Sequence, residues 1–241
     1  MSARRFFVSG VHRIEETVPI EGTDVHHALH VLRLSAGDRI EIIDSGARAF
    51  VAELTGDAAR LGARLIEERP RAATRELRVD VAQATPKAAK MDAIVEKATE
   101  LGAMLLIPFS SERTVVRRVG DAKLQRWRRI ARSAAEQCGR RDVPPVAAPI
   151  SYKELLARFC AYDAVLFAWE GATEPLRNQL PHLLNGADSV LAVIGPEGGF
   201  SHAEVDAARE CGAHIVSLGS RILRTETAAP ALLAIIDYIT G

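Results

Sequence analysis

The chain has 241 residues, of which 48% are hydrophobic and 26% charged, and its 31 basic side chains balance its 31 acidic ones. This composition is ordinary for a globular protein of one large or two small domains, and no apolar run approaches the roughly 20 residues of a membrane-spanning helix. The amino terminus lacks the long apolar stretch of a signal peptide. The three cysteines are widely spaced and form no CxxC pair, which predicts buried or incidental thiols in a reducing cytoplasm.

The first 70 or so residues are rich in strand signals. RRFFVS, DRIEIIDSG and RAFVAELT have strand propensity and are separated by Gly and Asp. Between them, residues 21–38 carry apolar side chains at helical spacing, with Asp24 as a candidate N-cap. These signals predict a small β-barrel with one helix. The polar segment ERPRAATREL predicts a boundary that divides the chain into domains of residues 1–72 and 73–241.

Two histidines in the predicted helix raise the question of a metal site. His26 and His30 are one helical turn apart, which is a spacing that metal sites use. No third ligand is evident and the chain has no HExxH motif, so we expect no metal. Contacts to a nucleic-acid backbone, with Arg33 contributing, are the interpretation we favour, and plain surface histidines are the alternative.

The second part of the chain alternates between strand and helix patterns, which predicts a mostly parallel α/β sheet. A long helix is expected over residues 121–139, with five apolar side chains from Leu124 to Cys138 on one face. The apolar carboxyl-terminal segment predicts a helix that belongs either to the core or to an oligomer interface. The predicted strands cover residues 77–84, 104–109, 162–170, 189–195 and 213–219.

Positive charge is concentrated in residues 113–141, which hold ten basic side chains against Asp121 and Glu136. Such a concentration is typical of a surface that binds a polyanion, since Arg and Lys contacts to phosphate supply most nonspecific nucleic-acid affinity. A solvated helix face is the alternative. The candidate phosphate-binding residues of this stretch are Arg113, Arg132, Arg140 and Arg141.

The loop GPEGGFS, residues 195–201, follows an apolar strand and precedes a helix that Ser201 and Glu204 begin with a capping box. Open α/β sheets bind ligands at the carboxyl ends of their strands, and glycines let a ligand approach the backbone. No Lys follows the glycines, so the loop is not a P-loop, and it does not match the dinucleotide-binding pattern GxGxxG. A glycine-rich turn without a ligand is the alternative.

The loop LGSRILRTETAAP, residues 218–230, also joins a strand to a helix. Arg221, Arg224 and Glu226 lie there between two apolar elements, and charges in such a place must be paired or solvated. They indicate either a structural ion pair or the edge of an active site, because two glycine-bearing loops leave consecutive strands on the same side.

Taken together, these motifs resemble the ribosomal RNA small subunit methyltransferase E family, whose members make 3-methyluridine in 16S rRNA. The resemblance rests on HVLR, KATELG, AAEQCGR, VPP, IGPEGGFSHAEV and LGSRILRTETA, in that order along nearly the whole chain. It implies a SPOUT-type α/β domain with a carboxyl-terminal trefoil knot, a PUA-like β-barrel at the amino terminus and a cytoplasmic homodimer. It also implies 16S rRNA of the 30S subunit as substrate. From the residues themselves we expect neither a membrane nor a metal as partner, since no long apolar run and no third metal ligand is evident.

The resemblance further implies that backbone groups of three loops hold S-adenosylmethionine. The matching positions are Phe167, Ala168 and Trp169 in the first loop, Ile194, Gly195, Pro196, Glu197, Gly198 and Gly199 in the second, and Leu218, Gly219, Ile222 and Leu223 in the third.

The chemistry of uracil N3 suggests roles for two charged residues. N3 carries a proton at neutral pH, so a base must accept that proton and a cation should stabilise the resulting anion. We expect Arg224 to be the cation, and Glu226 to act as base or to orient Arg224. Two alternatives remain open, a SPOUT enzyme that methylates the ribose 2′-OH and a noncatalytic rRNA-binding assembly factor.

Overall fold

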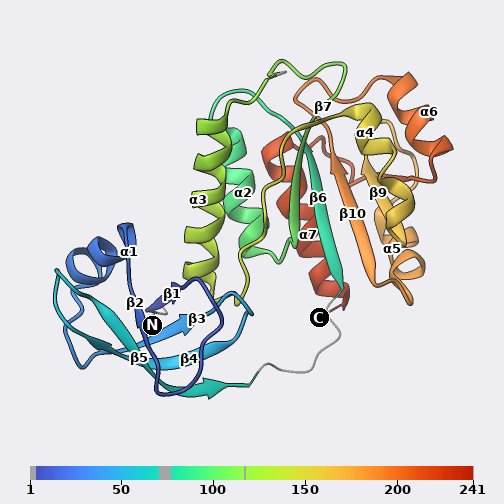
Figure 1. Cartoon of the computed structure of the whole chain (residues 1–241). Helices are drawn as coiled ribbons and strands as arrows, with labels where there is room; N and C mark the ends of the chain where they lie inside the picture. Colours follow the sequence, from blue (N-terminus) through green and yellow to red (C-terminus); the bar gives the residue numbers. More distant parts are fainter. Residues whose placement is uncertain (1–3, 71–76, 117, 241) are drawn as a thin grey trace. The chain divides into compact units, whose positions relative to one another are not determined.

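The computed structural model describes residues 4–70, 77–116 and 118–240, and it places them in two units (Figure 1). The first unit comprises Met1–Thr74 with Ala135–Asp142, and the second comprises Arg75–Ala134 with Val143–Gly241. The predicted boundary between residues 72 and 73 lies outside the described residues. None of the described helices combines the length and the apolar composition that a membrane-spanning segment needs.

The first unit is built on a five-stranded sheet in the order β1-β3-β4-β5-β2. β1 pairs with β3 in parallel, and the other neighbours are antiparallel. Among the described residues no pairing joins the edge strands β1 and β2. The strands are β1 (Arg5–Phe7), β2 (Thr17–Pro19), β3 (Arg39–Ile43), β4 (Ala49–Thr55) and β5 (Gly62–Arg69).

The predicted helix of this unit is short and changes its type partway along. α1 (Thr23–His26) continues as a π-helical turn, η1 (His27–Val31), and Ala28 packs into the core of the sheet. The predicted Asp24 cap is wrong, because the N-cap is Gly22 and Asp24 lies in the first turn of the helix. The sequence predicted the strands β1, β3 and β4 correctly, whereas it did not predict β2 and β5.

The second unit contains a six-stranded sheet in the order β11-β9-β10-β6-β7-β8, and every pairing in it is parallel. The predicted parallel α/β sheet is therefore confirmed. The sequence did not predict the strand β8 (Ile150–Ser151) or the helices α4 (Tyr152–Leu156), η2 (Phe159–Ala161) and α5 (Leu176–Leu184). The elements of this unit are β6 (Arg78–Ala84), α2 (Lys90–Glu100), β7 (Leu105–Ser110), α3 (Asp121–Cys138), β8 (Ile150–Ser151), α4 (Tyr152–Leu156), η2 (Phe159–Ala161), β9 (Ala164–Ala168), α5 (Leu176–Leu184), β10 (Ser189–Ile194), α6 (His202–Glu210), β11 (His214–Val216) and α7 (Thr225–Thr240).

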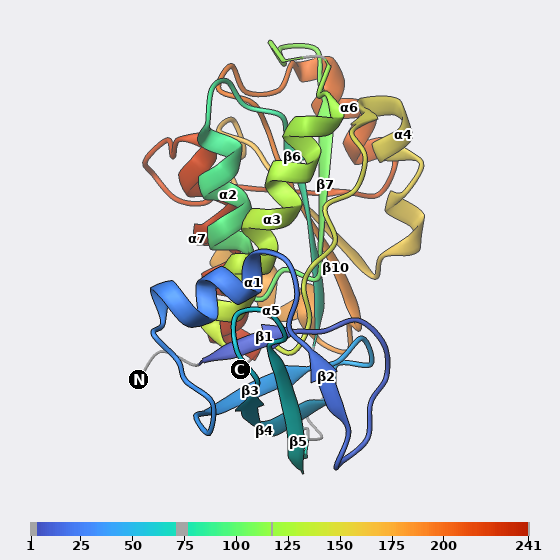
Figure 2. The same cartoon turned by 60° about the vertical axis from the view of Figure 1, so that its left-hand side comes forward.

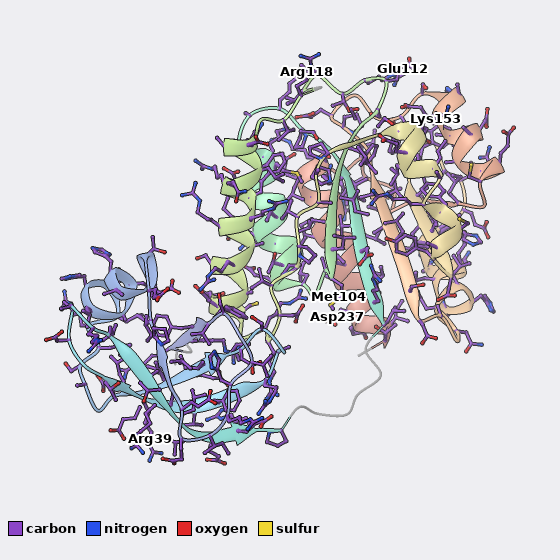
Figure 3. The ribbon with its side chains drawn as sticks, in the orientation of Figure 1. Arg39, Met104, Glu112, Arg118, Lys153 and Asp237 are labelled. Carbon is purple, nitrogen blue, oxygen red and sulfur yellow. The ribbon has the colours of Figure 1, made fainter. Side chains whose placement is uncertain are left out.

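Both faces of this sheet are covered, which explains its continuous apolar strands. In β10, Val190, Ala192 and Ile194 join the core that includes α2, α3, α5 and α7, while Leu191 and Val193 join the core that includes α4 and α6. Figure 2 shows α2, α3 and α7 together in front of the sheet. Figure 3 shows Met104 and Glu112, which flank β7, at opposite ends of the unit, with Glu112 at the carboxyl end.

The long helix α3 confirms the predicted helix, with Leu124, Trp127 and Ala131 buried on its apolar face. Cys138 was placed on that face wrongly, since it is exposed. Cys160 and Cys211 are also exposed, and all three cysteines are free thiols. Each stands in or directly after the last turn of a helix, where the chain turns toward solvent, so the expectation of buried thiols is wrong and incidental thiols fit.

Candidate active site

A cavity of about 610 Å³ lies where the chain leaves β9, β10 and β11. These strands are neighbours in the order β11-β9-β10 and are parallel, so the loops at their carboxyl ends meet at one edge of the sheet. Residues 168–170, 194–200 and 217–225 form most of the wall, and Lys90 and Ala228 complete it.

All of the predicted cofactor-binding residues except Phe167 line this cavity, as does Arg224. Phe167 is fully buried and packs against Phe200, with ring centroids 4.2 Å apart. Alternate side chains of a strand point to opposite faces, so Phe167 joins the core beside α6 while Ala168 points to the other face. Phe167 therefore does not line the cavity itself but packs against Phe200, which does.

The GPEGG loop has the local structure that its sequence predicts. Ser201 caps α6, and Glu204 accepts the Ser201 backbone N–H, so the capping box is confirmed. A Cβ at Gly195 would lie 2.9 Å from the Phe200 ring, and Gly199 has a φ of +65°. Glycine is therefore required at Gly195 by close packing and at Gly199 by backbone conformation.

A threonine hydroxyl fastens this loop to the start of α7. Thr225 Oγ1 donates to the Gly195 carbonyl at 2.6 Å and accepts a hydrogen bond from Gln83 Nε2 at 2.9 Å. Thr225 and Gln83 are both buried. One hydroxyl thus joins the carboxyl ends of β6 and β10 to the first residue of α7.

Lys90 makes the second link between the two predicted loops. Its Nζ lies 3.3 Å from Glu197 Oε1 and 3.3 Å from Glu226 Oε2, and Glu197 Oε1 also accepts the Lys87 backbone N–H at 3.0 Å. Partial desolvation acts to lower the pKa of Lys90, but hydrogen bonds to the two carboxylates outweigh it and raise that pKa. Partial burial acts to raise the pKa of Glu197, but backbone N–H groups and Lys90 outweigh it and lower that pKa.

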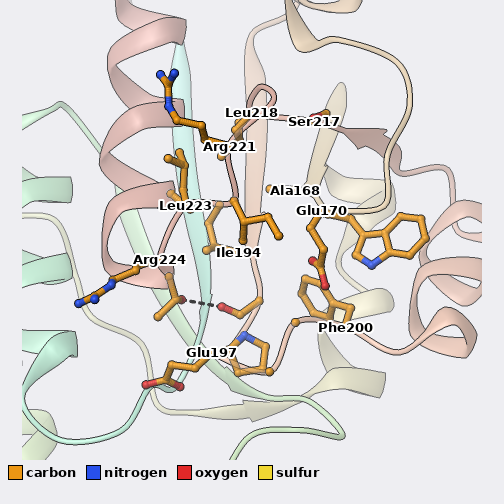
Figure 4. Close-up of a pocket in the computed structure, with 18 of the residues that line it drawn as sticks. Ala168, Glu170, Ile194, Glu197, Phe200, Ser217, Leu218, Arg221, Leu223 and Arg224 are labelled. Atoms are coloured by element: carbon orange, nitrogen blue, oxygen red, sulfur yellow. Dashed lines mark hydrogen bonds between the residues drawn. The ribbon is translucent and has the colours of Figure 1, made fainter.

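The two predicted catalytic residues occupy different positions. Arg224 is one of the residues that line the cavity, and Figure 4 shows its guanidinium and that of Arg221 extending away from the cavity. Glu226 is not among the lining residues, and its ion-pair partner within the described residues is Lys90 rather than Arg224. Sequence reasoning missed Lys90, because its helix meets the two glycine loops only in three dimensions, and it ended the first cofactor loop at Trp169, one residue before Glu170.

Arg113 lies against the GPEGG loop. Its Nη1 donates to the Gly198 carbonyl at 2.8 Å, and the neighbouring Glu112 backbone N–H donates to Glu204 Oε1 at 2.8 Å. Ser201 Oγ donates to Glu112 Oε2 at 2.8 Å. The segment after β7 therefore braces the loop, and Arg113, a predicted RNA-binding residue, lies next to the cavity.

The other predicted RNA-binding residues are distributed over the chain. His26, His30 and Arg33 are exposed, and the two imidazole centroids are 4.9 Å apart. No group of three or more potential metal ligands occurs in the part of the chain that the structure describes.

Arg132 is half-buried on α3. Arg140 pairs with Asp142, and Arg141 donates to the carbonyls of Arg69 and Pro70. Phosphate binding by these three arginines stays a prediction, although each of them already has a partner within the protein.

Comparison with known proteins gives concordant matches. A family model for the RNA methyltransferase domain matches residues 73–237, and one for the RNA methyltransferase PUA domain matches residues 20–60. The ribosomal RNA small subunit methyltransferase E of Bacillus subtilis (strain 168) is 34% identical over 248 residues, which covers 98% of this chain and 97% of that protein. That of Synechocystis sp. is 34% identical and covers 98% of this chain and 78% of its own length.

A solved structure extends the comparison to the fold. The ribosomal RNA small subunit methyltransferase E from Neisseria gonorrhoeae, bound to S-adenosyl methionine, superposes with a TM-score of 0.87 at 32% identity. The match covers 99% of this chain and 98% of that one.

Replacing Thr225 by Val should destabilise the protein by about 1–3 kcal/mol, because the half-buried Gly195 carbonyl and the buried Gln83 amide each lose a partner. Thr225→Ser retains the hydroxyl and is the matched control. Urea unfolding of the three proteins measures the free energy of unfolding. Equal stability of Thr225→Val and the wild type would show that the hydroxyl does not hold the loop.

Replacing Glu197 by Gln should remove a stability increment that depends on pH. Because the folded-state pKa of Glu197 is lowered, its contribution is fully present above the ordinary value of 4.5 and is lost as the pH falls through the folded-state pKa. The stability difference from the wild type should therefore be largest near neutral pH and shrink in acid. Glu210→Gln, an exposed glutamate that ends α6, is the control. A difference that grows as the pH falls would contradict the assignment.

Proposed function

The chain belongs to the ribosomal RNA small subunit methyltransferase E family, and from this we propose that it transfers a methyl group from S-adenosylmethionine to N3 of a uridine in 16S rRNA. The observation that carries the proposal is the convergence of three loops from neighbouring parallel strands on one cavity of about 610 Å³. A volume of this size is typical of sites for small molecules and cofactors.

The residues around the cavity fit S-adenosylmethionine. Glycines at 195, 198 and 199 leave backbone groups accessible, and Ile194, Leu218 and Leu223 supply apolar walls for an adenine ring. When bound, the cofactor supplies a methyl group on a positively charged sulfur, so the leaving group is a neutral thioether. The protein therefore needs to activate the uridine rather than the methyl donor.

We assign Arg224 to the uracil side of the reaction. As the N3 proton leaves, negative charge spreads over O2, N3 and O4, and a preorganised guanidinium that faces this charge can stabilise it. Arg224 is rooted in the cavity wall and extends outward, so its charge lies where a base could approach the methyl group from outside (Figure 4). Glu226 would act through Lys90, which it binds, or accept the proton itself.

The RNA must present an unpaired or flipped uridine, because N3 lies in the Watson–Crick edge of a paired base. We propose that the first unit, part of which matches the RNA methyltransferase PUA domain, holds the surrounding RNA. His26, His30, Arg33 and the arginines of residues 113–141 would contribute contacts to phosphate.

We further propose that the second unit is a SPOUT-type domain with a trefoil knot and that the protein is a homodimer. The all-parallel sheet supports the first point. The composition of α7 supports the second, since Leu232, Leu233 and Ile236 are buried whereas Tyr238 and Ile239 on the same helix are exposed apolar residues.

The test is methyl transfer with 30S particles and with free 16S rRNA, followed by nucleoside digestion and mass spectrometry. We expect 3-methyluridine as the product. A 2′-O-methylated nucleoside would replace the proposal by ribose methylation. Absence of both cofactor binding in calorimetry and methyl transfer would leave the noncatalytic assembly factor.

Arg224→Ala should lower kcat for methyl transfer by about 10²- to 10³-fold, the usual loss when one group that stabilises developing charge is removed. Arg221→Ala is the matched control, since both arginines lie on the cavity rim and extend outward. Affinity for S-adenosylmethionine should stay unchanged in both variants. Near wild-type turnover in Arg224→Ala and in Glu226→Ala would remove both residues from the catalytic assignment.

A further inference from the structure

Glu170 is a carboxylate in the cavity wall that no part of the mechanism above uses. It follows Trp169 two positions after the end of β9 and lines the cavity opposite Leu223. We infer that the Glu170 carboxylate binds a cationic group of S-adenosylmethionine. The inference rests on the proposed function and assigns a binding residue that the sequence motifs do not mark.

The position of the Glu170 side chain is set by its surroundings. Figure 4 shows it running along the cavity wall between Ala168 and Phe200. A Cβ on Gly199 would lie 2.4 Å from Glu170 Oε1, so the end of the Glu170 side chain lies directly against the GPEGG loop. The carboxylate is therefore placed where the first and second walls of the cavity meet.

The backbone that carries Glu170 is held on both sides. The Trp169 N–H donates to the Val216 carbonyl at 3.1 Å, and the Trp169 ring packs edge-on against His202 with centroids 5.3 Å apart. A Cβ on Gly171 would lie 2.5 Å from the Trp169 ring, so the chain folds back tightly over the indole. These contacts fix the direction in which Glu170 leaves the backbone.

The charges around the cavity leave Glu170 without a cation from the protein. Among the described residues no ion pair or hydrogen bond reaches its carboxylate. Lys90 is engaged by Glu197 and Glu226, and Arg221 and Arg224 extend away from the cavity. Glu170 is exposed in the open cavity, so its carboxylate is free to pair with a ligand that brings its own positive charge.

S-adenosylmethionine has two such charges, the sulfonium and the α-ammonium, and a carboxylate can serve either. The two possibilities differ in their consequence for the reaction. A carboxylate that faces the sulfonium binds the methyl donor more tightly than the product S-adenosylhomocysteine, whose sulfur is neutral, and so favours product release. A carboxylate that faces the ammonium binds both alike.

The experiment is calorimetry of the full chain with three ligands that carry two, one and no cationic groups: S-adenosylmethionine, S-adenosylhomocysteine, which keeps the ammonium but has a neutral sulfur, and 5′-methylthioadenosine, which has neither cation. The variant is Glu170→Gln, and Glu210→Gln is the control because it makes the same change at an exposed site outside the cavity. Glu170→Gln should weaken binding of S-adenosylmethionine by about 5-fold, the upper value for an ion pair at an exposed site. Binding of 5′-methylthioadenosine should not change.

The measurement with S-adenosylhomocysteine then identifies which cation Glu170 binds. If Glu170→Gln weakens binding of S-adenosylhomocysteine as much as binding of S-adenosylmethionine, the cation is the ammonium. If binding of S-adenosylhomocysteine is unchanged, the cation is the sulfonium. Equal effects on S-adenosylmethionine and 5′-methylthioadenosine, or no effect on either, would overturn the inference. If the wild-type chain binds none of the three ligands, the proposed function itself fails. Salt titration of the wild-type protein gives a test without a variant, because an ionic contact weakens S-adenosylmethionine binding as salt rises and leaves 5′-methylthioadenosine binding unaffected.

Discussion

The Thr225 hydroxyl is the contact on which the arrangement of the cavity depends. It donates to the Gly195 carbonyl and accepts from Gln83, so the first residue of α7 is tied to the ends of β10 and β6. An unpaired carbonyl or amide at a buried position costs free energy, so this junction resists opening. The GPEGG loop and the segment before α7 can form two walls of one cavity because this junction fixes their separation.

Carboxylates then hold the surrounding loops by accepting backbone N–H groups. Glu197 accepts from Lys87 and pairs with Lys90, while Glu204 caps its own helix and accepts from Glu112. The loops after β6 and β7 are thereby fastened to the loop after β10. A site built in this way is largely preorganised, so a ligand loses little of its binding free energy to ordering the protein.

The same junctions determine which charges remain for a ligand. Lys90 lies in the wall, but its two carboxylate partners compensate its charge, and both arginines of the rim extend outward. Glu170 is the charged group directed along the inner wall without a protein partner among the described residues. This distribution, with a carboxylate along the inner wall and two arginines extending outward, suits the positively charged methyl donor and the uridine substrate that we propose.

The sequence alone determined the alternation of strands and helices in the second unit, the parallel sheet and the helix cap at Ser201, because these follow from apolar periodicity and from side-chain to backbone contacts only three residues apart. It also identified the glycine loops, whose residue types are set by local conformation. The tertiary structure decided that Phe167 lies behind the wall, that Lys90 joins Glu197 to Glu226, and that Glu170 fits over Gly199. The short strand β2, whose pairing with β5 is non-local, also became visible only in the fold. These features depend on segments that are far apart in the chain, and a single sequence carries no signal for the distance between such segments.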